Sequence, residues 1–335
     1  MGSVPSKPRE MRGETGPFPF SGHTDSRMDA IVTQHLAKIY GGHIGRGGVK
    51  SLDDLNLAIG PNEVFGFLGR NGAGKTTTIK ILCSLLRATE GQAFVMGKDV
   101  RKRETRAHIG YLPENPYFYE YLNPRETLDF YGELNGLTRP QRNAEWERLA
   151  DLLDLHEFAG QRVRGFSKGM RQRLGFAVAL VGDPEVLILD EPMSGLDPLG
   201  RRMIRELILL LRAQGKTVFF SSHVLGDVEQ ICSRVGILVK GRLTTQGRLD
   251  ELLTRRVNRV EIIAEGLSAT AAAALAARAD GTRESEQGRH FFVNDMDAAN
   301  GIAAEVMQSG GKLVEFTPIR ESLEEYFMRE QETGS

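Results

Sequence analysis

The sequence predicts an α/β protein with a mainly parallel sheet, followed by a small C-terminal α+β domain. From Ile31 to about Gly247, short β-branched runs alternate with amphipathic helical segments, the pattern of parallel strands joined by crossover helices. Around Asp250 this alternation stops and a different set of strands and helices begins. The expected parts are a disordered N-terminal extension (1–29), a main domain (30–248) and an accessory domain (249–332), because the extension is rich in Gly, Pro, Ser and charge.

The strand-like runs of the main domain are short and apolar, as buried parallel strands are. They comprise Val64–Leu68, Val186–Leu189, Thr217–Ser221 and Val235–Val239. A mostly helical stretch, Pro113–Gly182, separates the first two of these runs. Within it, Asn123 can cap a helix, Pro124 suits the first helical position and Glu126 completes a capping-box spacing. The sequence therefore predicts a helix starting near Asn123.

The accessory domain shows alternating short strands and helices with no cluster of ligand-like residues. Its expected elements are Val257–Ala264, an Ala-rich helix, His290–Val293, Asp297–Gln308, Lys312–Phe316 and Glu321–Arg329. They predict a small α+β unit that either packs on the main domain, aiding dimerisation, or has a regulatory or substrate-linked role.

Composition and charge set limits on the class of protein. The 335 residues are 40% hydrophobic and 26% charged, and the formal net charge of −1 gives no support for wholesale attraction to nucleic acid. No apolar run approaches the roughly 20 residues that span a bilayer, and the N-terminus lacks the apolar run of a secretory signal. Cys83 and Cys232 are too few for a disulfide framework, and each is interpreted as a core residue rather than a redox or metal site.

Residues 69–76 (GRNGAGKT) match the phosphate-binding pattern GxxxxGK[ST]. They follow the apolar run Val64–Leu68 and open an apolar-faced helix, which is the context that makes the pattern specific. Glycines let backbone N–H groups turn toward phosphates, and the helix N-terminus adds favourable partial charge. Lys75 is expected to reach the β- and γ-phosphates of ATP, and Thr76 to bind Mg²⁺. The expected nucleotide-binding residues of this segment are Gly69, Asn71, Gly72, Gly74, Lys75, Thr76 and Thr77.

A second set of polar residues follows two of the other strands. Val186–Leu189 ends in Asp190, which is placed to bind Mg²⁺, and in Glu191, a candidate general base for the attacking water. His223 follows the strand Thr217–Ser222 and is placed to contact the γ-phosphate. The expected catalytic groups are Glu191, His223 and Lys75.

Four further segments carry a resemblance to the ABC ATPase family. Phe166–Arg173 (FSKGMRQR) looks like the family's signature LSGGQ in an exporter form. Ser194–Asp197 (SGLD) resembles its D-loop and Ser222-His223 its switch histidine, and Tyr40 stands where an aromatic ring stacks on adenine. The resemblance spans roughly residues 31–247. It implies a P-loop NTPase fold: a RecA-like core, an antiparallel β part and a helical signature subdomain at about residues 113–182.

The sequence departs from the family pattern at two places. These departures indicate a particular branch of the family and do not argue against ATPase activity. Glu114 occupies the place of the glutamine in the family's Q-loop, where a carboxylate can still ligate Mg²⁺ but adds negative charge. Lys168 and Met170 replace the usual Gly and Gln of the signature. Both departures resemble the sequences of ATPases of type-2 exporters, which transport drugs, lipids or polysaccharides. The tail Glu321–Phe327 (ESLEEYF) resembles the closing element of the same ATPases.

The resemblance also implies partners. In this family the signature of one copy covers the nucleotide of another, so Ser167, Gly169 and Asp197 are expected to meet ATP across a dimer interface. The chain holds one set of motifs, so a complete site needs a second ATPase subunit, identical or paralogous. The expected function is ATP-driven export through a separate integral-membrane permease, with this chain peripheral on the cytoplasmic face of the membrane. The alternative is a soluble ABC ATPase that acts on ribosomes or DNA.

Overall fold

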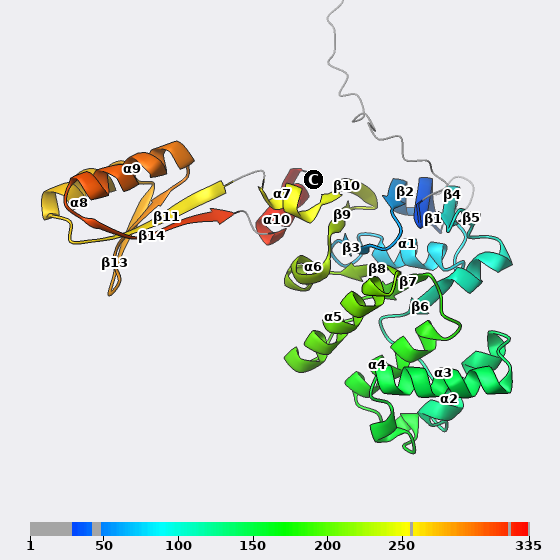
Figure 1. Ribbon diagram of the computed structural model, residues 1–335. Coiled ribbons are helices and arrows are strands. Elements are labelled where there is room, and N and C mark those ends of the chain that lie inside the picture. The colour runs from blue at the N-terminus through cyan, green and yellow to red at the C-terminus, as the bar shows by residue number, and fades with distance from the viewer. Residues whose placement is uncertain (1–28, 42–47, 255–256, 321–322, 334–335) are drawn as a thin grey trace, which may run out of the picture.

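The computed structural model describes residues 29–41, 48–254, 257–320 and 323–333, so residues 1–28 of the predicted extension lie outside the described part. A six-stranded sheet with the order β10-β9-β3-β8-β7-β6 forms its centre (Figure 1). The strands from β9 to β6 run parallel, and β10 pairs antiparallel with β9 at one edge. The strands are β3 (Val64–Leu68), β6 (Ile109–Leu112), β7 (Val186–Asp190), β8 (Thr217–Ser222), β9 (Arg234–Val239) and β10 (Arg242–Arg248). This confirms the predicted P-loop type of α/β fold.

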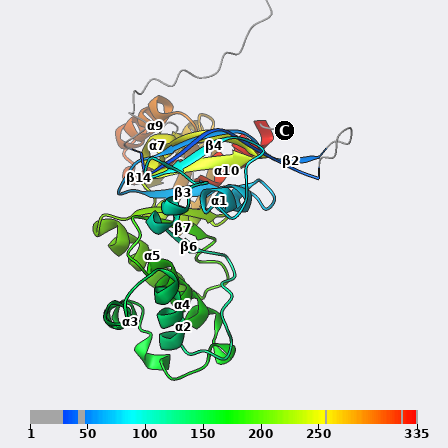
Figure 2. The ribbon, with the colours of Figure 1, turned by 90° about the vertical axis from the view of Figure 1, so that its right-hand side faces the viewer.

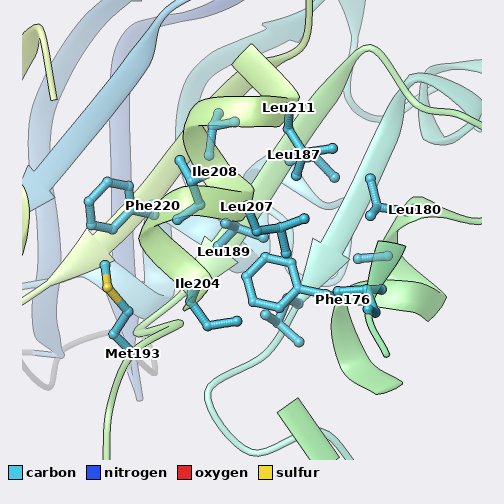
Figure 3. Packing of buried hydrophobic residues seen from close by; sticks show 14 of the residues in the cluster. Phe176, Leu180, Leu187, Leu189, Met193, Ile204, Leu207, Ile208, Leu211 and Phe220 are labelled. Atoms are coloured by element: carbon cyan, nitrogen blue, oxygen red, sulfur yellow. The ribbon is translucent and has the colours of Figure 1, made fainter. Parts of the chain in front are cut away.

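The three central strands, β3, β7 and β8, are buried along their whole length because both faces of the sheet are covered. On one face, Phe176 of α4 (Lys168–Leu180) and Leu207 of α5 (Pro198–Ala213) lie with Leu187 and Leu189 in one hydrophobic cluster (Figure 3). On the other face, apolar side chains of the sheet pack with α1 (Lys75–Leu82). This double cover fixes the carboxyl ends of the strands, where the polar residues follow.

A four-stranded antiparallel sheet, β2-β1-β4-β5, forms the β part implied by the family resemblance. Its strands are β1 (Ile31–Tyr40), β2 (Val49–Ile59), β4 (Glu90–Val95) and β5 (Lys98–Asp99). The pairing of β1 with β2 shifts register between Thr33 and Leu36 and again between Leu36 and Lys38. Such bulges break the two-residue alternation, which is why no strand bounds were apparent in this part of the sequence.

The helical insertion lies on the opposite side of the main sheet from this antiparallel sheet (Figure 2). It contains α2 (Pro124–Leu134), α3 (Arg139–Leu152), α4 and short 3-10 turns at His156–Phe158 and Val163–Gly165. Asn123 accepts a hydrogen bond from the backbone of Glu126 and donates one to its side chain, both at 2.9 Å, so the predicted capping box is confirmed. Residues 113–123 are not helical, and the first helix of the stretch begins at Pro124, beside the predicted Asn123. No helix in the described part is long and apolar enough to cross a bilayer.

The C-terminal region forms a third sheet with the order β12-β13-β11-β14. Its elements are β11 (Val257–Glu265), α8 (Ala269–Ala276), β12 (Gly281–Ser285), β13 (Gly288–Val293), α9 (Met296–Gln308) and β14 (Lys312–Arg320). This is the βαββαβ arrangement with antiparallel pairing throughout. Its own hydrophobic cluster lies between the sheet and the two helices, and the unit stands away from the main sheet (Figure 1).

The last helix, α10 (Leu323–Thr333), returns to the main domain. Leu323 is fully buried in the cluster that covers the main sheet, and its backbone N–H donates to the carboxylate of Glu229 at 2.8 Å. Glu229 lies in α6 (Leu225–Ile231). The βαββαβ unit is thus connected to the main domain at both ends, through α7 (Leu249–Thr254) and through α10.

Candidate active site

The loop after β3 forms a tight backbone turn that leads into α1. Gly72 and Gly74 have φ angles of +82° and +112°, in the region that favours glycine. A β-carbon on Gly74 would lie 2.6 Å from the carbonyl oxygen of Ser51, so no larger residue fits there. The turn and the N-terminus of α1 are the arrangement that binds phosphate groups through backbone N–H groups.

Lys75, the first residue of α1, is nearly buried at this turn, with 6% of its surface exposed. Its ammonium donates to the carbonyl of Gly69 at 2.6 Å and lies 3.3 Å from Oε1 of Glu191. A buried ammonium is retained only with such partners. It is therefore a fixed positive charge at the mouth of the loop.

The carboxyl end of β7 carries two nearly buried carboxylates with different partners. Asp190 accepts a 2.7 Å hydrogen bond from Ser221 Oγ, and the hydroxyl of Thr76 lies 3.5 Å from the same Asp190 oxygen. Glu191 has a φ of +49°, and its carboxylate reaches Lys75 on one oxygen. Its other oxygen lies 2.8 Å from Nδ1 of His223, at the end of β8.

One pocket collects most of the predicted residues of the loop and of the strand ends. Its lining residues are Ser51, Arg70, Asn71, Gly72, Gly74, Lys75, Thr76, Thr77, Glu114, Glu191 and His223. Gly69 and Asp190 do not line the pocket but contact two residues that do: Gly69 accepts a hydrogen bond from Lys75, and Asp190 lies 3.5 Å from the hydroxyl of Thr76. The phenol of Tyr40 lies 3.5 Å from the hydroxyl of Thr77, with the Lys38 ammonium 5.3 Å from its ring centre, so Tyr40 stands beside the pocket.

A second, separate hollow holds the remaining predicted residues. It is lined by Ser167, Gly169, Met170, Gln172, Arg173, Gly195, Leu196, Asp197, Leu199, Gly200, Met203 and Ile204. Ser167 caps the N-terminus of α4 and Asp197 that of α5 through side-chain acceptors. The two hollows share no lining residue, so Ser167, Gly169 and Asp197 do not line the pocket of the phosphate loop.

Several residues of the site were not predicted from the sequence. Ser221 joins the Asp190 carboxylate to the backbone of Glu191, because its hydroxyl donates to Asp190 and accepts from the Glu191 backbone N–H at 2.9 Å. Gln172 of α4 is buried and donates to the carbonyl of Pro192, next to Glu191, at 2.7 Å. Ser221 ends a strand, which is not a distinctive pattern, and Gln172 lies within the signature segment Phe166–Arg173, whose resemblance gave it no separate role.

Two groups beneath the pocket are held neutral by their surroundings. Burial, and then the negative charge of Asp190, raises the pKa of the Cys83 thiol far above its usual value. Burial is also the largest cause of the raised pKa of Tyr111, followed by Cys83 and Asp190. Both cysteines are buried and unpaired, as predicted for core residues.

This phosphate loop, the acidic strand end and the histidine that contacts Glu191, on a parallel sheet, define a P-loop ATPase. The sequence profile described as ABC transporter matches residues 52–194. An uncharacterized ABC transporter ATP-binding protein from Synechocystis is 40% identical over 307 residues, 91% of this chain and 85% of its own length. The bacitracin transport ATP-binding protein BcrA of Bacillus licheniformis is 41% identical over 228 residues, 67% of this chain and 72% of its own length.

Solved structures agree on the fold. The ATP-binding subunit of an ABC transporter superposes with a TM-score of 0.59 at 29% identity, covering 67% of this chain and 91% of that one. A dimeric ATP-binding cassette in a post-hydrolysis state with ADP and Pi superposes with a TM-score of 0.60 at 22% identity, covering 65% of this chain and 98% of that one. The chain belongs to the ATP-binding proteins of ABC transporters, and it is an ATPase.

Proposed function

We propose that this chain is the motor subunit of an exporter, in which two ATPase subunits close around two ATP molecules and drive a substrate through a separate membrane permease. The observation that carries the proposal is the division of the site into two hollows with no shared residue. A phosphate loop in one place and a signature surface in another, each ending on a helix N-terminus, are complementary halves of one site. Two chains placed head to tail therefore form two complete sites, each with the phosphate loop of one chain and the signature surface of the other.

In each half-site the triphosphate of ATP lies in the loop before α1, with Lys75 between the β- and γ-phosphates and adenine against Tyr40. The oxygens of Thr76 and Asp190 suit Mg²⁺, which prefers oxygen ligands and commonly takes one or two from protein and the rest from phosphates and water. Bound there, the ion would neutralise charge on the phosphates. Glu114 lines the same pocket and is the third oxygen donor proposed for it.

Hydrolysis in this proposal is an in-line attack of water on the γ-phosphorus. Glu191 accepts the proton of the attacking water, the bond from the γ-phosphorus to the bridging oxygen breaks, and ADP leaves with that oxygen. His223 holds the Glu191 carboxylate at 2.8 Å and lies at the pocket rim, where its ring reaches the γ-phosphate. A phosphate in the loop competes for the Lys75 ammonium, which loosens its 3.3 Å contact to Glu191. The second subunit supplies Ser167 and Gly169 to the γ-phosphate, with Asp197 beside them.

The permease would dock on the helical insertion, just after Glu114. Tyr119, Tyr121 and Phe130 form an exposed aromatic cluster there, with exposed fractions of 46%, 61% and 36%, and Tyr117, close to them in the sequence, is 79% exposed. Tyr119 contacts both Tyr121 and Phe130, with ring centres 5.7 and 5.5 Å away. Clustered exposed aromatics mark interaction surfaces. The name of the relative BcrA, a bacitracin transport ATP-binding protein, supports a role in transport. Docking on a permease would place the chain on the cytoplasmic face of the membrane.

Affinity purification from native membranes, followed by mass spectrometry, tests the partner. A stoichiometric polypeptide with about six hydrophobic spans is expected, and Tyr117→Ser with Tyr121→Ser should release it without lowering ATP binding. Recovery of ribosomal proteins or DNA in its place would overturn the transport proposal and leave the ATPase intact.

A further inference from the structure

One buried carboxylate ties the helix after His223 to α5. Asp227, in α6, is 4% exposed. Its Oδ1 lies 2.9 Å from Nη1 of Arg205, and its Oδ2 lies 3.8 Å from Nη1 of Arg201. A carboxylate this deeply buried is stable only when it is paired. The two arginines of α5 therefore fix the position of α6.

Arg201 also reaches the D-loop, Ser194–Asp197. Its Nε donates to the carbonyl of Leu196 at 3.3 Å, while its guanidinium faces Asp227. Glu191, three residues before the D-loop, lies with its carboxylate 2.8 Å from Nδ1 of His223. Residues 191–196 are thus connected at both ends to the short stretch from His223 to Asp227.

The backbone between His223 and α6 is short and constrained. Ser222 accepts a hydrogen bond from the Val224 N–H at 2.9 Å, and α6 begins at the next residue, Leu225. Val228 and Ile231 of α6 are buried in the main cluster, so the helix packs directly against its neighbours. A displacement of α6 must therefore displace the His223 backbone as well.

We propose that Asp227 is a positioning residue for ATP hydrolysis. Through Arg201 it keeps α6 in register with the D-loop, so that the His223 imidazole stays within reach of Glu191. The inference rests on the role of His223 in the proposed function. Because the D-loop lines the signature hollow, a subunit bound there would act on His223 along the same connection.

The test is a double-mutant cycle between Asp227→Asn and His223→Ala, read as kcat, KM for ATP and Tm. Asp227→Asn keeps the shape of the side chain and removes its charge. In the wild-type background we expect kcat to fall ~10-fold with KM for ATP unchanged, because small misplacements of catalytic groups are costly in rate. In the His223→Ala background kcat should fall no further, although Tm falls by the same amount in both.

Two controls separate positioning from general damage. Glu229→Gln removes a carboxylate of the same helix that faces α10 instead of α5, and Arg202→Gln changes the neighbour of Arg201 in an exposed pair with Glu206. Both should retain the wild-type kcat. Should Asp227→Asn fail to fold, Arg201→Gln replaces it, because that change breaks the connection to the D-loop and leaves the Arg205–Asp227 pair.

Each outcome decides the matter. An equal fold-loss of kcat in both backgrounds would mean that Asp227 acts by stability alone and would overturn the inference. A normal kcat for Asp227→Asn beside a slow His223→Ala would overturn it as well, with the proposed function unharmed. Full activity of His223→Ala would remove the histidine from the proposed mechanism and this inference with it.

Discussion

The main domain and the βαββαβ unit each enclose a hydrophobic cluster, but they differ in what else they bury. Among the described residues, the buried Lys, Asp and Glu side chains all lie in the main domain: Lys75, Asp190, Glu191, Lys216 and Asp227. In the βαββαβ unit the buried polar side chain is His290, which contacts Glu261 at 2.7 Å and Ser285 at 2.6 Å. Buried charge is costly and gathers where chemistry needs it. Among the described residues, the buried Lys, Asp and Glu side chains thus lie in the domain that carries the phosphate loop.

The largest effect should come from replacing Glu191, the proposed general base, which contacts the buried ammonium of Lys75. Glu191→Gln should bind ATP but turn it over ~10²-fold or more slowly, as loss of a general base does. The measurement is steady-state phosphate release beside a nucleotide-binding titration. Glu206→Gln, an exposed carboxylate of α5, is the control. Near-normal turnover of Glu191→Gln would remove Glu191 from its role.

Lys75→Ala should weaken nucleotide binding itself, by ~10-fold or more in Kd, since the buried ammonium is the charge proposed to contact the phosphates. Titration with a fluorescent ATP analogue measures this. Lys80→Ala is a matched control, because Lys80 lies on the same helix and is exposed. Equal affinity in the two variants would show that the loop backbone alone binds the nucleotide.

Core truncations should separate the two regions by stability. Phe291 in β13 and Phe220 in β8 are both fully buried, and each change to Ala should cost about 3–5 kcal/mol locally. Phe291→Ala should leave the ATPase rate unchanged at a temperature where both regions stay folded, whereas Phe220→Ala should lower it. Differential scanning calorimetry and phosphate release are the measurements. An ATPase loss in Phe291→Ala as large as in Phe220→Ala would erase the contrast.

The smallest effect is expected at the thiols, which both lie in the main domain. Burial raises the pKa of Cys83 and of Cys232, with lesser contributions from Asp190 and Glu63. The raised values keep both thiols protonated, so thiolate is scarce from neutral pH to well above the usual thiol pKa, and reagent access is low. Labelling with a maleimide should be absent in the native chain and complete in denaturant. Fast labelling of the native chain would contradict the packing of this domain.

The chemistry of the site was more predictable than its surroundings. The loop from Gly69 to Thr76 and the Asp190-Glu191 pair were visible because phosphate and metal binding restrict residue type and order. Ser221 was missed because a serine ending a strand has no distinctive pattern. The link from Asp227 to the D-loop was missed because it joins residues from separate elements. No local sequence pattern records such a contact.

Element bounds were predicted unevenly for physical reasons. Buried strands such as β3 and β8 were found within a residue, since their apolar runs end where the sheet does. The edge strand β12 (Gly281–Ser285) was missed because most of its side chains are exposed and polar, which gives no alternation. The helix α10 was expected, but its return to α6 was not, since the sequence of an amphipathic helix does not name its partner.

In the proposed function two chains complete each ATP site, and the dependence of turnover on self-association tests this pairing. Phosphate release per chain should be measured over a range of concentrations, together with sedimentation of the Glu191→Gln variant with and without ATP and Mg²⁺. We expect activity per chain to rise with concentration and ATP to convert Glu191→Gln from monomer to dimer. Ser167→Arg in that variant should abolish the dimer and spare ATP binding. Full turnover per chain, independent of concentration, in a species that sediments as a monomer would contradict the account.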